Sequence, residues 1–158
     1  MRIMPILLIV LFLLGLCGCK ATGGTTQAGE PLDITAFSFT HQGSSTDQCY
    51  RYTATQEGDS IRLHTEELFS GGLVIDTLIT EPLLEQLGEI AGTYRLDRWD
   101  GFDKTKGSVA DGSGFSLSIT LADGKTISAR GSNKFPDGYA DAKGEIKALF
   151  ETLIDQYS

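Results

Sequence analysis

Apolar and polar residues alternate in most of six strand-like stretches of this chain, and this alternation limits the fold more strongly than any other feature. A strand places successive side chains on opposite faces, so alternation predicts half-buried strands. Glu57-Gly58-Asp59 and Asp123-Gly124 are turn signals between neighbouring stretches, and they predict two antiparallel hairpins. The predicted strands cover residues 34–40, 49–55, 61–65, 73–79, 114–121 and 125–129.

Two other stretches carry apolar residues at three- and four-residue spacing, which is typical of amphipathic helices. They cover residues 81–94 and the chain from about residue 137 to its end. Thr80 is expected to cap the first helix, and Gly88 and Gly92 are expected to weaken it by up to about 1 kcal/mol each. The order ββββ-α-ββ-α predicts an α+β domain, with an antiparallel sheet of about six strands and two helices packed on one face.

The N-terminus is a separate unit. Arg2 supplies a positive charge, residues 3–16 are almost wholly apolar, and Gly18 provides a small side chain before Cys19. This arrangement is typical of a signal peptide. The apolar run is also shorter than the roughly 20 residues that a membrane-spanning helix needs, so a permanent span is the weaker interpretation.

The segment Leu16-Cys17-Gly18-Cys19 resembles the lipobox of bacterial lipoproteins. The resemblance implies that the Cys19 sulfur receives a diacylglyceryl group and that cleavage makes Cys19 the new N-terminus. Two buried acyl chains hold a protein firmly at a bilayer, whereas one holds it weakly. The resemblance therefore implies a protein attached to a cell membrane by lipid on Cys19, facing the periplasm or the cell exterior. The alternative is an ordinary secretory signal with an incidental cysteine.

Three regions follow from this interpretation. Residues 1–18 are the lipoprotein signal peptide, residues 19–30 are the lipidated cysteine with a flexible tether, and residues 31–158 are a single domain. The tether is expected to be flexible because Lys20 to Glu30 includes no large apolar side chain. The remainder is long enough to bury a core of its own.

Charge and cysteine content narrow the function classes. The chain has 21 acidic and 13 basic residues and a net charge of −8, which opposes binding to nucleic acid because phosphates require clustered Lys and Arg. With Cys17 removed and Cys19 acylated, Cys49 is the remaining thiol. A free cysteine in a strand is usually buried, so we expect Cys49 to be an inert core residue rather than a reactive thiol.

No motif nominates a catalytic group, a metal site or a cofactor. His41 and His64 have no partner at metal-ligand spacing, and the glycines match no nucleotide-binding pattern. Four acidic residues crowd residues 95–112, but their spacing is not that of an EF-hand, so they are interpreted as solvated turn residues rather than a weak Ca²⁺ site. These residues are Asp97, Asp100, Asp103 and Asp111.

The irregular segment 95–112 is the best candidate for function, because long loops in compact domains are often functional. A short strand over residues 96–99 is also expected within it. Aromatic residues in this segment and before the last helix predict a binding surface, since they give a large contact area at low entropy cost. The alternative is that they plug the ends of the sheet. The candidate surface comprises Arg95, Trp99, Asp100, Phe102, Arg130, Asn133, Phe135 and Tyr139.

Residues 111–150 are similar to the C-terminal part of uncharacterised envelope domains in bacterial lipoproteins, and this resemblance implies an envelope location without any catalytic residue. The first hypothesis is a non-enzymatic binding or interaction module with an envelope protein partner. The alternative is an enzyme, or an enzyme accessory, that acts on envelope material with acids from residues 95–112. A solute-binding lipoprotein is a third hypothesis, although the chain is short for the usual two-lobed form.

Overall fold

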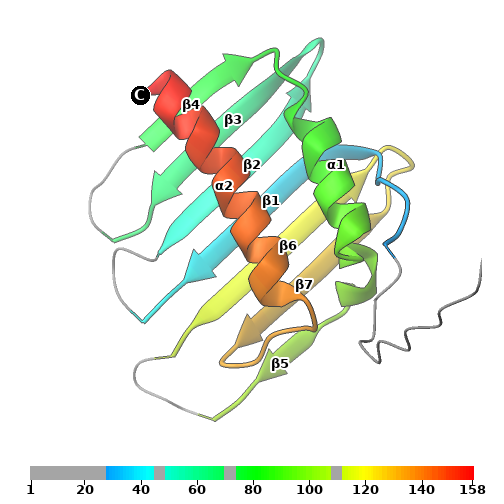
Figure 1. Cartoon of the computed structure of the whole chain (residues 1–158), viewed down its shortest axis with the longest axis vertical. Coiled ribbons are helices and arrows are strands. Elements are labelled where there is room, and N and C mark those ends of the chain that lie inside the picture. The colour runs from blue at the N-terminus through cyan, green and yellow to red at the C-terminus, as the bar shows by residue number, and fades with distance from the viewer. Residues whose placement is uncertain (1–27, 45–48, 70–73, 108–111) are drawn as a thin grey trace, which may run out of the picture.

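The computed structural model describes residues 28–44, 49–69, 74–107 and 112–158, and it shows an α+β domain. One mixed sheet of seven strands carries two α-helices on the same face (Figure 1). The elements are β1 (Ile34–Gln42), β2 (Tyr50–Glu57), β3 (Ser60–Glu67), β4 (Val74–Ile79), α1 (Leu83–Thr93), the 3₁₀ turn η2 (Leu96–Trp99), β5 (Asp103–Thr105), β6 (Gly114–Leu121), β7 (Thr126–Ser132) and α2 (Tyr139–Tyr157).

The predicted signal peptide, Cys19 and all but the end of the predicted tether lie outside the described residues. Within the described ranges, none of the helices is both long and apolar enough to cross a membrane.

The strand order is β4-β3-β2-β1-β6-β7-β5, so β1 lies at the centre of the sheet. Both predicted hairpins are present: β2 pairs antiparallel with β3, and β6 pairs antiparallel with β7. The prediction of about six antiparallel strands is corrected by β5, which pairs parallel with β7 at the sheet edge. Sequence alternation could not reveal β5 because its three residues are all exposed.

Two local predictions are also corrected. Residues 96–99 form the 3₁₀ turn η2 rather than a strand, and their apolar members Leu96 and Trp99 turn into the core. Pro82, rather than the expected Thr80, occupies the N-cap position of the first helix. Its side chain makes no capping hydrogen bond.

The two sheet faces differ as the alternation predicts. On β1, the buried positions Phe37 and Phe39 face the helices, whereas Ser38 between them is only partly covered. Phe150 of α2 lies flat on Tyr52 of β2, with ring centroids 4.5 Å apart and planes within 5°. The helices therefore bury one face of the sheet.

The segment before β1 packs closely on α1, and two glycines permit this contact. Leu32 N donates to Gly88 O at 3.1 Å, and Gly29 N donates to Gly92 O at 2.9 Å. A Cβ atom on Gly88 would lie 2.2 Å from Leu32 O, and one on Gly92 would lie 2.3 Å from Glu30 O. The packing on α1 thus begins at Gly29, before the domain start expected from the sequence.

Candidate functional site

An open cavity of about 670 Å³ lies where the segment after α1 meets the segment before α2. We call it the aromatic groove. Its walls include four of the predicted surface residues, which are Arg95, Trp99, Phe102 and Phe135. The structure therefore brings these four residues together in one cavity.

The turn after α1 sets one wall of the groove. Arg95 adopts a left-handed backbone conformation with φ 54°, and η2 begins directly after it. The Arg95 guanidinium donates two hydrogen bonds to the Asp97 carboxylate, at 3.0 and 2.9 Å, and these bonds hold the pKa of Asp97 below its usual range. Phe102 N donates to Trp99 O at 2.8 Å, which closes the turn. The wall is thus built by local hydrogen bonds.

Beneath the groove the aromatic rings form part of the core. Trp99 is 3% exposed and Tyr139 is 6% exposed, so both rings are buried. The Tyr139 ring stacks on Phe135 at 4.5 Å and lies 4.7 Å from Phe115, measured between centroids. Phe102 and Phe135 are only partly buried. Trp99 and Tyr139 therefore plug the end of the sheet, while Phe102 and Phe135 remain partly open to a ligand.

A buried hydrogen bond fixes Tyr139 from below. The Nδ1 atom of His41 on β1 lies 2.9 Å from the Tyr139 hydroxyl oxygen. Burial, with a contribution from nearby Lys143, lowers the pKa of His41 to about 4, so the imidazole is neutral near pH 7. His41 is thus a structural residue of the groove floor. The other histidine, His64, is on β3, and its ring nitrogens lie 3.9 Å from carboxylate oxygens of Asp76 and Glu66.

Tyr139 lies beneath the groove, and the other three predicted surface residues make contacts elsewhere. The Asp100 carboxylate accepts a hydrogen bond from Ser128 N at 2.9 Å. Arg130 forms an ion pair with Asp103 across β7 and β5. Asn133, at φ 54°, accepts a hydrogen bond from Ser113 N at 2.9 Å through its side-chain oxygen. These residues fasten loops and strands to one another.

Charge is mixed around the groove. Arg98, Lys104 and Lys134 line it together with Asp137 and Asp141. The Lys104 ammonium lies 5.1 Å from the centroid of the Phe102 ring, at a distance that suits a cation–π contact. Apart from Arg95, which pairs with Asp97, the groove has three basic and two acidic side chains, although the chain as a whole is strongly acidic.

The acids of residues 95–112 are engaged in structural contacts where they are described. Asp97 binds Arg95, Asp100 binds Ser128 N, and Asp103 binds Arg130. Asp111 lies outside the described residues. In the described part of the chain, no three His, Cys, Asp or Glu side chains are grouped so as to hold a metal ion.

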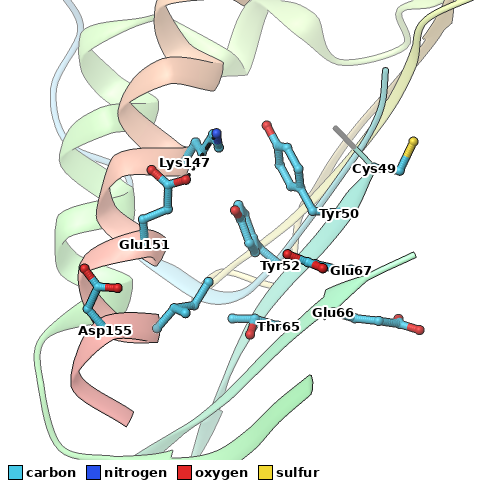
Figure 2. A pocket seen from close by; sticks show the side chains of 10 residues that line it. Cys49, Tyr50, Tyr52, Thr65, Glu66, Glu67, Lys147, Glu151 and Asp155 are labelled. Carbon is cyan, nitrogen blue, oxygen red and sulfur yellow. Dashed lines mark ion pairs between the residues drawn. The ribbon is translucent and has the colours of Figure 1, made fainter. Parts of the chain in front are cut away.

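Sequence reasoning missed a second cavity of about 340 Å³, which lies between α2 and the β2–β3 hairpin (Figure 2). We call it the tyrosine pocket. Tyr50 and Tyr52 of β2 form one wall, and Lys147 and Glu151 of α2 form the other. The available signal was the two-residue spacing of the tyrosines and the four-residue spacing of charges on α2. Nothing in the sequence, however, places α2 over β2.

Neither the models of known protein families nor the curated proteins include a match to this chain. The fold and the groove therefore define its class: an α+β domain whose two helices cover one face of a seven-stranded sheet, with an aromatic groove at the start of α2.

Proposed function

We propose that this chain is a lipid-anchored envelope protein, and that its domain is a non-enzymatic binding module whose partner occupies the aromatic groove. The anchor rests on the resemblance of residues 16–19 to a lipobox, and one structural observation carries the binding module. The partly exposed rings of Phe102 and Phe135 lie beside Arg98, Lys104 and Lys134 in one open cavity of about 670 Å³. Aromatic and arginine side chains in a concave site are the groups that contribute most to protein interfaces.

The expected partner is an envelope protein that presents an apolar side chain next to an acidic one. The apolar side chain would contact the rings of Phe102 and Phe135, and the carboxylate would face Arg98 and Lys134. Asp137 and Asp141 on the same groove select against strongly acidic partners, because like charges placed together are costly.

The route of the chain supports a position close to the membrane. A Cβ atom on Gly29 would lie 2.7 Å from the Arg95 Cδ atom, so the chain leaves the domain beside the groove. Gly29 is ten positions after Cys19, and a fully extended chain of that length spans at most about 35 Å. With lipid on Cys19, the groove would therefore open within a few nanometres of the bilayer.

The alternative of an enzyme with acids from residues 95–112 is less favoured. Three of these acids are already bound by Arg95, Ser128 N and Arg130. A general acid or base needs a carboxyl group that is free to exchange a proton with a substrate.

The groove is tested by photo-crosslinking in intact cells, with a photoreactive residue at Lys134 of the full chain. A specific envelope protein should be crosslinked, and the adduct should disappear in an Arg98→Glu, Lys104→Glu variant. Lys125→Glu is the matched control, because Lys125 lies in the β6–β7 turn away from the groove. Equal yields of the crosslinked adduct in the parent chain, the double variant and the Lys125→Glu control would refute the groove as the binding surface.

The anchor is tested separately by fractionation of cells that produce the full chain or its Cys19→Ser variant. The full chain should sediment with membranes and take up radiolabelled palmitate, whereas the variant should do neither. Unchanged processing and location of Cys19→Ser would instead indicate an ordinary secretory signal.

A further inference from the structure

The tyrosine pocket lies at the opposite end of α2 from the aromatic groove and shares no lining residue with it. Its base is the β2–β3 hairpin, in which Tyr52 pairs with Thr65 and Tyr50 pairs with Glu67. These four side chains lie side by side because paired residues on antiparallel strands point to the same sheet face. A ligand in this pocket would therefore not contact the residues that line the groove.

Two buried hydroxyl groups of the pocket have no hydrogen-bond partner in the described structure. They are Tyr50 Oη and Thr65 Oγ1, on residues that are 7% and 2% exposed. Most buried polar groups are hydrogen-bonded, since an unpaired one is costly to the fold. Figure 2 shows the Tyr50 hydroxyl pointing toward the side of α2 that carries Lys147. Tyr50 and Thr65 both line the same cavity, but their hydroxyls lie on either side of Tyr52, so a single ligand must be extended to reach both.

Carboxylates stand on two walls of the pocket. Glu67 is at the end of β3, and Glu151 and Asp155 are on α2 (Figure 2). Lys147 is the single basic side chain in the lining, and its ammonium lies 3.1 Å from the Glu151 carboxylate. Both partners of this pair are about half exposed, so the pair is weak and can open to admit a ligand. Glu66 also lines the pocket, and its carboxylate pairs with Arg51.

The shift in the pKa of Tyr50 agrees with a negative electrostatic potential in the tyrosine pocket. Burial raises the pKa of the Tyr50 hydroxyl, and the nearby Glu151 carboxylate raises this pKa further. The hydroxyl is therefore protonated near pH 7, and its oxygen can accept a hydrogen bond from a donor group of a ligand.

The walls also contain hydrocarbon. Ile154 lines the pocket and is partly buried. The faces of Tyr50 and Tyr52 are stacked on each other with centroids 4.6 Å apart, and the other face of Tyr52 is covered by Phe150. A ligand therefore meets ring edges and the Ile154 side chain, which suit methylene groups better than another aromatic ring.

We propose that the tyrosine pocket binds a linear aliphatic diamine. One ammonium group donates to the Glu151 carboxylate on α2 and to the Tyr50 hydroxyl, which points toward α2, and the other donates to Glu67 and the Thr65 hydroxyl. The methylene chain between them packs on Ile154 and the ring edges. The cavity of about 340 Å³ is at the small end of the range for small-molecule sites, as a compact ligand requires.

The proposal is tested by isothermal titration calorimetry of the full chain in detergent micelles, with 1,5-diaminopentane as the probe. Saturable binding is expected. Tyr50→Phe and Thr65→Val should each weaken it roughly tenfold, because each removes one hydrogen bond to a charged group and little volume. Both variants should keep the folded structure, since neither hydroxyl has a described partner.

A matched pair of charge variants tests the acidic wall. Glu151→Gln should weaken binding of the diamine, whereas Glu145→Gln, on the same helix but outside the pocket lining, should not. The diacid glutarate, of the same length but opposite charge, should give no signal.

Three results would overturn the assignment. The first is no saturable binding of the diamine. The second is unchanged affinity in both Tyr50→Phe and Thr65→Val. The third is an equal response to MgCl₂ at matched ionic strength that is also lost in Glu151→Gln, because this would show a site for cations in general rather than for an amine.

Discussion

His41 on the central strand and Tyr139 at the start of α2 form a buried hydrogen bond, with Nδ1 and the hydroxyl oxygen 2.9 Å apart. Tyr139 in turn stacks on Phe135, whose ring borders the aromatic groove. A titratable residue in the core therefore holds the floor of the candidate site. Protonation of His41 would add a charge to this apolar contact, so the stability of the fold depends on pH.

We expect the stability to fall as the pH falls from about 6.5 toward 4. The pKa of His41 is about 4 in the folded protein and near 6.5 in the unfolded chain, so the unfolded state binds the proton more tightly in that interval. The loss between pH 7 and pH 4.5 should reach about 2–3 kcal/mol. Urea unfolding at a series of pH values measures it.

The control for this prediction is His41→Gln, which can still hydrogen-bond to Tyr139 but does not titrate. Its free energy of unfolding should change less with pH across the same interval. Parallel pH profiles for the two proteins would show that His41 is not responsible.

Gly88→Ala should destabilise the domain even though alanine favours helices. The added Cβ atom would lie 2.2 Å from Leu32 O, so the segment before β1 must move away and break its hydrogen bond to Gly88 O. Gly144→Ala in α2 is the matched control, because no atom beyond the adjoining backbone of its own helix lies within 4 Å of its Cβ position. That variant should gain up to about 1 kcal/mol from helix propensity. Stabilisation of both variants by thermal unfolding would contradict the close packing.

Trp99→Ala should cost about 3–5 kcal/mol of stability, as expected for a large buried ring in a core. Trp99 is 3% exposed and contacts Phe115 and Tyr139. It is the single tryptophan of the chain, so its fluorescence also reports unfolding of the wild type directly. Phe102→Ala should cost less, because that ring is only partly buried. If Trp99→Ala kept full stability in urea, Trp99 would be a surface contact residue instead of a core residue.

Cys49 should react slowly with a thiol reagent in the folded protein and quickly in urea. It is buried, and its sulfur lies 3.7 Å from Gly43 O. The reaction is followed on a Cys17→Ser, Cys19→Ser chain, in which Cys49 is the remaining thiol. Equal rates in the two conditions would show that the thiol is accessible in the native state.

The sequence alone was sufficient for most of the fold. Alternation and three- to four-residue spacing reflect which side chains a strand or a helix turns toward the core, and this is a local property of the chain. The hairpin at Asp123-Gly124 and the buried face of α2 could therefore be predicted. β5 and the turn at Leu96–Trp99 could not, because exposed edge strands and 3₁₀ turns have no comparable period.

For the candidate site, the sequence determined which residue types were available, and the tertiary structure decided which of them meet. Trp99, Phe102 and Phe135 were candidates because they are aromatic residues near loops, but burial divides them into core and groove. Arg130 and Asn133 were grouped with them by proximity in sequence, yet the pairing of β7 with β5 and β6 turns them to other contacts. The tyrosine pocket was missed entirely, because it forms only where α2 crosses β2 and β3. Local periodicity records which side of an element is apolar, whereas the meeting of two polar groups depends on how distant elements pack.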